Sequence, residues 1–78
     1  MITVKFVEPL KDFKINLMFD NDEEKIFDMT GYLYHGIFSG LKDVSIINSV
    51  KVAFDTIEWS NGADLCPEVL YSNSRNID

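Results

Sequence analysis

The chain is short of cysteine, histidine and positive charge, and each shortage excludes a class of protein. One cysteine cannot form an internal disulfide, and Cys66 and His35 alone supply too few soft ligands for a structural zinc site. Seven basic residues against 13 acidic ones give a net charge of −6, which argues against direct binding of nucleic acid. No apolar run approaches the ~18 residues that a membrane-spanning helix needs. We therefore expect no metal, no cofactor, no nucleic acid and no membrane partner.

The ends of the chain carry no targeting signal that we can identify. The N-terminal sequence MITVKFVEPL lacks an apolar core and a small-residue cleavage site. A lone thiol without an export signal indicates a cytoplasmic protein. With 78 residues, the chain is expected to form a single domain over residues 1–72, and the polar residues 73–78 are expected to be a frayed tail.

Alternation of apolar and polar residues in the first half predicts a three-stranded antiparallel meander. The strands are expected over residues 2–7, 13–19 and 24–29, because side chains on a strand alternate between its two faces. Residues 8–12 break the first alternation. Asp20-Asn21-Asp22-Glu23 predicts a hairpin turn, since asparagine tolerates a positive φ.

The second half mixes strand and helix signals. Residues 30–40 are rich in aromatics and glycine and are expected to cover one edge or face of the sheet, and Asp43 is placed to cap a short helix over residues 44–48. Val50, Val52 and Phe54 alternate again and residues 57–59 resume the pattern, which fits either a hairpin or one strand with a bulge.

Residues 60–72 predict a turn and a final helix. Ser60-Asn61-Gly62 has turn composition, and Pro67 suits the first position of a helix that runs to about Ser72. The predicted fold class is α+β, with a small, mostly antiparallel sheet of about four to five strands and one or two short helices.

Five segments in this order resemble the bacterial proteins called domain of unknown function 2442. They are ITVKFVEPL, FDNDE, IFDMTGYL, GIFSGLKD and TIEWSNGADLCPEVLY, and the resemblance runs from Ile2 to about Tyr71. It implies a small α+β domain with no established enzymatic activity. Some relatives carry a helix-turn-helix domain after this one, which we do not expect here because the chain ends at Asp78. Others lie beside a second small protein and are suspected toxin–antitoxin partners.

The segment NGADLCPE and its neighbours hold the first set of candidate binding residues, which are Trp59, Asn61, Asp64, Cys66, Glu68 and Tyr71. Cys66 near a helix start has the position of a nucleophile, with His35 as its base, but a free cysteine more often packs as a small apolar group. Asn61 and Asp64 either offer oxygens to a ligand or stabilise the turn. Trp59 is either a binding platform or part of the core.

A second set of candidates is acidic. Asp20, Asp22, Glu23, Glu24 and Asp28 lie close together in sequence beside a single lysine. They are either a surface for a basic partner or a solvated surface that keeps a small protein soluble.

Three functions are compatible with these features. The favoured one is a non-enzymatic module that binds another small protein, as the acidic partner in a two-gene, toxin–antitoxin-like pair. The alternatives are a small ligand-binding or catalytic domain centred on Asn61, Asp64 and Cys66, and a sensor domain that works with a separate DNA-binding protein. A homodimer is also expected, because so small a core needs further support, through an exposed sheet edge or the aromatic loop at residues 32–38.

Overall fold

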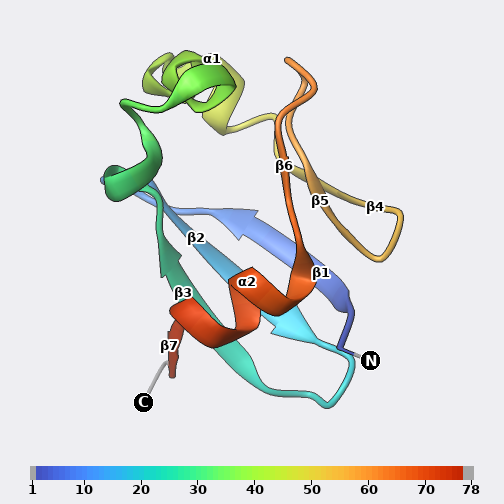
Figure 1. The fold of residues 1–78 in the computed structure, drawn as a ribbon. Helices are drawn as coiled ribbons and strands as arrows, with labels where there is room; N and C mark the ends of the chain where they lie inside the picture. The colour runs from blue at the N-terminus through green and yellow to red at the C-terminus, as the bar shows by residue number, and fades with distance from the viewer. Residues whose placement is uncertain (1, 77–78) are drawn as a thin grey trace.

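Two antiparallel sheets and a few short helices form the computed structural model, which describes residues 2–76 (Figure 1). The first sheet has the order β1-β2-β3-β7, with the strands β1 (Val4–Pro9), β2 (Lys14–Phe19), β3 (Glu24–Asp28) and β7 (Arg75–Asn76). The second has the order β4-β5-β6, with β4 (Lys51–Ala53), β5 (Thr56–Glu58) and β6 (Asp64–Leu65). The α+β class is confirmed, and the strands divide between two sheets rather than one.

The meander of β1, β2 and β3 is confirmed, but β1 starts and ends two residues later than the sequence pattern predicted. The alternation fails after Val7, yet the strand continues to Pro9, which pairs with Ile15 of β2. Proline is tolerated here because β1 is an edge strand of its sheet, where a missing backbone N–H need not break a ladder bond.

Residues 30–47 form short helices that close one end of the first sheet. They are the 3₁₀ helices η1 (Thr30–Tyr32) and η2 (Gly36–Lys42) and the helix α1 (Val44–Ile47). The Tyr32 ring lies 5.5 Å from that of Phe27 on β3 and 5.9 Å from that of Phe38. The aromatic segment therefore packs against the sheet, as expected. Asp43 accepts a hydrogen bond of 2.9 Å from the Ser45 N–H, which confirms the predicted helix cap.

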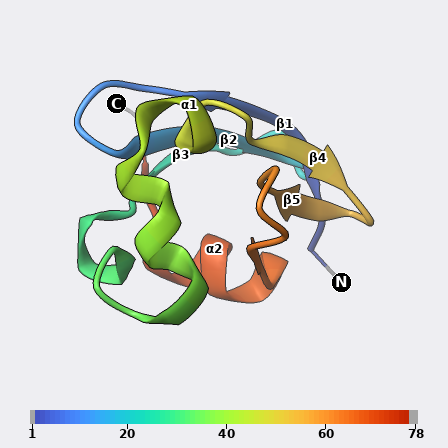
Figure 2. The ribbon, with the colours of Figure 1, turned by 90° about the horizontal axis from the view of Figure 1, so that it is seen from above.

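The β4–β5 segment is a hairpin, one of the two arrangements that the sequence allowed. Ala53 pairs with Thr56, so Phe54 and Asp55 form a two-residue turn with φ values of 53° and 67°. The alternation placed Phe54 on a strand beside Val52, which is wrong: Phe54 is 93% exposed at the turn. The Val4 N–H donates to the Asp55 carbonyl at 2.9 Å, which brings the hairpin beside β1 (Figure 2).

The C-terminal part differs from the predicted tail. Helix α2 (Pro67–Asn73) begins at Pro67 as expected, and its Leu70 is fully buried. Arg75 and Asn76 then pair with Ile26 and Lys25 as β7 rather than fraying, because β3 offers an open edge there. Residues 77–78 of the expected tail lie outside the described residues.

The core fills the space between the first sheet, α2 and the second sheet. Figure 2 shows the first sheet arching over α2. The fully buried large side chains of the core are Phe19, Phe27, Ile15, Leu17, Met29, Leu41, Ile57, Leu70 and Trp59. On β2 the fully buried Ile15, Leu17 and Phe19 alternate with Lys14, Asn16 and Met18, so the strand presents one apolar face to the core.

Candidate functional site: an acidic hairpin turn

The turn between β2 and β3 concentrates negative charge on a defined backbone geometry. We call residues 20–24, which include four acids, the acidic turn. The Phe19 N–H donates to the Glu23 carbonyl at 3.0 Å, and the Asp22 N–H donates to the Phe19 carbonyl at 2.9 Å. Asp22 has a φ of 68°, at the third position of a three-residue loop that glycine usually occupies. The turn therefore carries a carboxylate where the backbone alone favours glycine.

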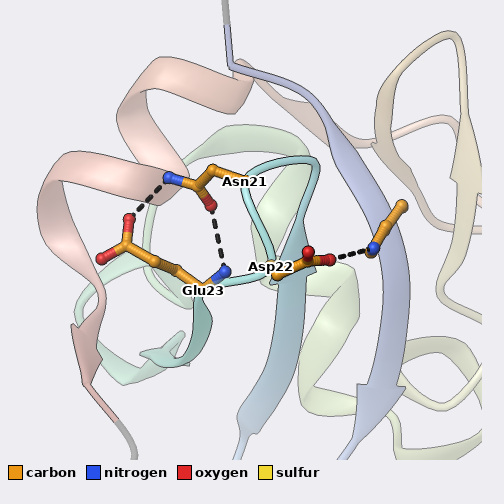
Figure 3. Close-up of polar contacts among 4 residues, drawn as sticks. Asn21, Asp22 and Glu23 are labelled. Atoms are coloured by element: carbon orange, nitrogen blue, oxygen red, sulfur yellow. Dashed lines mark hydrogen bonds and ion pairs between the residues drawn. The ribbon is translucent and has the colours of Figure 1, made fainter.

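Side chains within the turn hold it in one conformation (Figure 3). The Asn21 amide donates to the Glu23 carboxylate at 2.7 Å, while the Asn21 Oδ1 accepts from the Glu23 N–H at 3.0 Å. Asp22 forms an ion pair with Lys5 of β1. Both partners are exposed, so this pair contributes at most about 1 kcal/mol.

Tyr71 of α2 connects the helix to the acidic turn. Its hydroxyl donates to the Glu23 carboxylate, and its ring packs edge-on against Phe19 with 5.1 Å between ring centroids. Lys25 lies 4.2 Å above the same ring and donates to the Tyr71 carbonyl at 3.3 Å. The structure thus brings together one member of each predicted set, Glu23 and Tyr71.

The hydrogen bonds at Glu23 favour its ionised form and bring no positive charge with them. Donation from Tyr71, and then from Asn21, lowers the pKa of Glu23, and the Glu23 carboxylate in turn raises the pKa of Tyr71. Glu24 accepts a bond of 2.8 Å from the Asn16 amide. Because these donors are neutral, they leave the charge of the turn unchanged, and Lys25 is the nearby cation that adds to the lowering of the Glu23 pKa.

Asp28 does not belong to the acidic turn, although the sequence grouped it there. It is the last residue of β3, at the end remote from the turn, and pairs in register with Lys14. Its carboxylate accepts from the Thr30 N–H at 2.9 Å and the Thr30 hydroxyl at 2.7 Å, and these bonds lower the pKa of Asp28. Its role is to order the start of η1 (Thr30–Tyr32).

Trp59 and Asn61 have structural roles. Trp59 is 1% exposed, and its Nε1 donates to the Ile47 carbonyl at 3.2 Å, so the structure assigns it to the core rather than to a binding platform. Asn61 Oδ1 accepts from the Ala63 N–H at 3.1 Å, and its amide donates to the Ile37 carbonyl at 3.3 Å. These contacts, with Gly62 at a φ of 89°, are the turn chemistry that the sequence offered as one alternative.

Asp64, Cys66 and Glu68 lie on the surface without forming a catalytic arrangement. Asp64 is exposed on β6, opposite Glu58. The exposed Cys66 thiol donates to the Glu68 carboxylate at 2.8 Å, and this bond is the main cause of the lowered pKa of Glu68. A carboxylate is not the cationic neighbour that activates a nucleophilic cysteine. No hydrogen bond within residues 2–76 joins Cys66 to His35.

An apolar cleft of about 650 Å³ lies away from the NGADLCPE segment. It opens between residues 9–13, which connect β1 to β2, and helix α1. We call it the turn–helix cleft. The catalytic alternative required a pocket beside α2, and neither Asn61, Asp64 nor Cys66 lines this one.

Sequence analysis missed both the cleft and the exposed Phe54. Asp55, which tolerates a positive φ between two strand-like runs, was the one signal that marked the turn.

Residues 2–76 contain neither a candidate metal site nor a candidate membrane-spanning helix. Within residues 2–76, no group of three histidine, cysteine, aspartate or glutamate side chains is placed to hold a metal ion. None of the helices in that range combines the length and the apolar character needed to cross a membrane.

The fold and the site together define a small α+β domain with an acidic hairpin turn tied to its last helix. The family described as "Protein of unknown function (DUF2442)" matches residues 4–76, so the chain belongs to this family. No curated protein matches the chain. No solved structure matches it either.

Proposed function

We propose that this protein is a non-enzymatic binding module that recognises a small basic protein through its acidic turn. The observation that carries the proposal is the charge of the turn. Of its four acids, Asp22 alone takes part in an ion pair within residues 2–76. The others accept hydrogen bonds from neutral groups or face solvent, and Lys25 beside Glu23 offsets part of their charge, so a basic partner still meets a net negative surface.

The turn is also rigid enough to recognise a partner at low entropic cost. Asn21 closes it from within, and Tyr71 ties Glu23 to α2. Side chains that are already ordered lose less freedom on binding, so more of the interaction energy appears as affinity. The net charge of −6 adds a long-range attraction that accelerates encounter with a basic protein.

The partner that we propose is the small protein encoded beside this gene, as in a two-gene pair. Its purified form is the probe, and its affinity for this chain is measured by calorimetry at low salt. In the test variant Asp20→Asn/Glu24→Gln, two charges that form no ion pair within residues 2–76 leave the acidic turn, and glutamine at position 24 keeps an oxygen for the Asn16 amide. The matched control, Glu8→Gln/Asp12→Asn, removes two charges near the opposite end of β2 by the same two kinds of substitution.

The proposal predicts that the test variant binds at least about tenfold more weakly than the wild type, while the control stays within about threefold. Equal losses in both variants would assign the effect to total charge rather than to the turn. If the wild-type chain did not bind the neighbouring protein, the proposal would be contradicted.

The two alternative functions have less support. The ligand-binding or catalytic alternative needs Asn61, Asp64 and Cys66 around a pocket, whereas Asn61 is engaged in its own turn and Cys66 donates to Glu68. A sensor domain that acts with a separate DNA-binding protein stays a prediction. It would be supported if the neighbouring protein that binds this chain itself bound DNA.

A further inference from the structure

Phe54 has no explanation within a single copy of the chain. It occupies the first position of a two-residue turn in which both φ values are positive, a geometry that favours asparagine or glycine. Its ring is 93% exposed, more than any other large apolar side chain of the described residues. In the isolated chain, the backbone strain of this turn and the hydrated aromatic ring are therefore not offset by any burial of the Phe54 side chain.

The turn–helix cleft is apolar and open to water. Leu10 and Phe13 line one wall, and Val44 and Ile47 of α1 line the other. Val44 is 62% exposed. Asp12 and Phe13 both have φ values of 62°, so the wall formed by the β1–β2 connection is itself strained. The volume of about 650 Å³ is within the range of sites that enclose small apolar groups.

One copy cannot fill its own cleft with its own Phe54. The β4–β5 turn is fixed beside Val4, the first residue of β1, by the bond from the Val4 N–H to the Asp55 carbonyl. The cleft begins at Pro9, the last residue of the same strand. At about 3.3 Å per residue the two ends of β1 lie roughly 17 Å apart. Figure 1 shows the hairpin directed away from the β1–β2 connection.

We propose that Phe54 of one copy inserts into the turn–helix cleft of a second copy, and that two such contacts form a twofold dimer. The occupant of the cleft is thus a second copy of this chain. Each contact gives Phe54 the burial that it lacks and covers the apolar wall formed by Val44 and Phe13.

One ion pair is available between the two surfaces, beside Asp12, which is also exposed on the lining of the cleft. Asp55 follows Phe54 in the turn and is exposed, and Lys11 is exposed on the lining of the cleft. Insertion of the ring brings this carboxylate towards that ammonium group. The net charge of −6 on each copy opposes association, so salt, which screens this repulsion, strengthens the dimer. Binding at the acidic turn has the opposite salt dependence, which separates the two proposals.

Sedimentation velocity over a concentration series tests the proposal, at low and high salt. The contact area is small, so the wild type is expected to dimerise with a Kd on the order of 0.1 mM. Phe54→Asn keeps the turn geometry and removes the ring, and Val44→Glu places a charge in the cleft. Each variant is expected to stay monomeric at concentrations where the wild type is mostly dimeric. The matched control Tyr34→Asn removes another exposed ring, in the aromatic loop, and is expected to dimerise as the wild type does.

A mixing experiment shows whether the ring and the cleft meet. Isotope-labelled Phe54→Asn, whose cleft is intact, is titrated with unlabelled Val44→Glu, whose ring is intact. Chemical-shift changes at Leu10, Phe13 and Ile47 are expected, with none when the added protein is also Phe54→Asn. This mixture retains only one of the two contacts, so the titration is carried to millimolar concentration. A wild type that remains monomeric at that concentration, a dimer that survives Phe54→Asn, or changes at the cleft that are the same with either added protein would each overturn the proposal.

Discussion

At the scale of single residues, the contact between Glu23 and Tyr71 joins the two sets of candidates that the sequence kept separate. The phenol donates to the carboxylate, which requires a protonated tyrosine and an ionised glutamate. The pKa of Glu23 is lowered and that of Tyr71 is raised, both in the direction that preserves this pairing. The contact is therefore sensitive to pH at both extremes.

The acid side of this dependence can be tested with Tyr71→Phe. A lowered pKa in the folded state means that the contribution of Glu23 to stability is fully present above the ordinary glutamate pKa of about 4.3 and is lost as pH falls through the lowered value. Tyr71→Phe keeps the ring on Phe19 but removes the donor, so the pKa of Glu23 is expected to rise. A titration of the side-chain carboxyl carbon by NMR measures it, and identical curves in both proteins would contradict this assignment.

Trp59 supports the core through both its ring and its indole N–H. Trp59→Phe keeps an aromatic side chain but leaves the Ile47 carbonyl without its donor, and is expected to lower the free energy of unfolding by about 1–3 kcal/mol. Urea denaturation measures the change. Tyr34→Ser, which alters a side chain that is 78% exposed, is the control and is expected to stay within about 0.5 kcal/mol. A Trp59→Phe protein as stable as the wild type would show that the indole bond contributes little.

At the scale of elements, the sequence predicted the meander, the starts of two helices and the turns at residues 20–23 and 60–62, and it failed at the end of β1 and at the β4–β5 turn. Asp43 and Pro67 start helices through local chemistry that a few residues contain. Pro9 looked like a strand breaker, because its tolerance depends on lying at a sheet edge. Phe54 looked like a strand residue, because alternation does not reveal where a hairpin reverses. The error at Pro9 arises from tertiary context, whereas the β4–β5 turn had one local signal, Asp55, which the alternation of apolar residues outweighed.

Two glycines test how far backbone conformation governs the turns. A Cβ at Gly62 or at Gly31 would meet no atom within 4 Å, but Gly62 alone of the two has a positive φ, of 89°. Gly62→Ala is therefore expected to destabilise the chain by about 1–2 kcal/mol. Gly31→Ala is expected to be neutral or to stabilise it by up to about 1 kcal/mol. Thermal denaturation of the two variants in parallel measures these changes. Equal losses of stability in both variants would mean that the positive φ of Gly62 does not determine the effect of the substitution.

At the scale of the whole molecule, net charge and small size are the properties that can be obtained most directly from the sequence. The acids of residues 20–24 were identified as a candidate surface, but their hydrogen bonds to Asn16 and Tyr71 depend on strand register and on where α2 packs. The turn–helix cleft joins residues more than 30 positions apart, so it had no local signature. A sequence pattern thus located the charge, and only the fold located the apolar site.

The salt dependence of association with the protein encoded beside this gene tests the central proposal most directly. The rate constant for association is measured at increasing salt for the wild type and for Asp20→Asn/Glu24→Gln. Attraction by the acidic turn predicts a wild-type rate that falls steeply with salt, a slower variant with a shallower slope, and convergence of the two rates at high salt. A wild-type rate that does not change with salt, or a variant that is slower by the same factor at every salt concentration, would contradict the account.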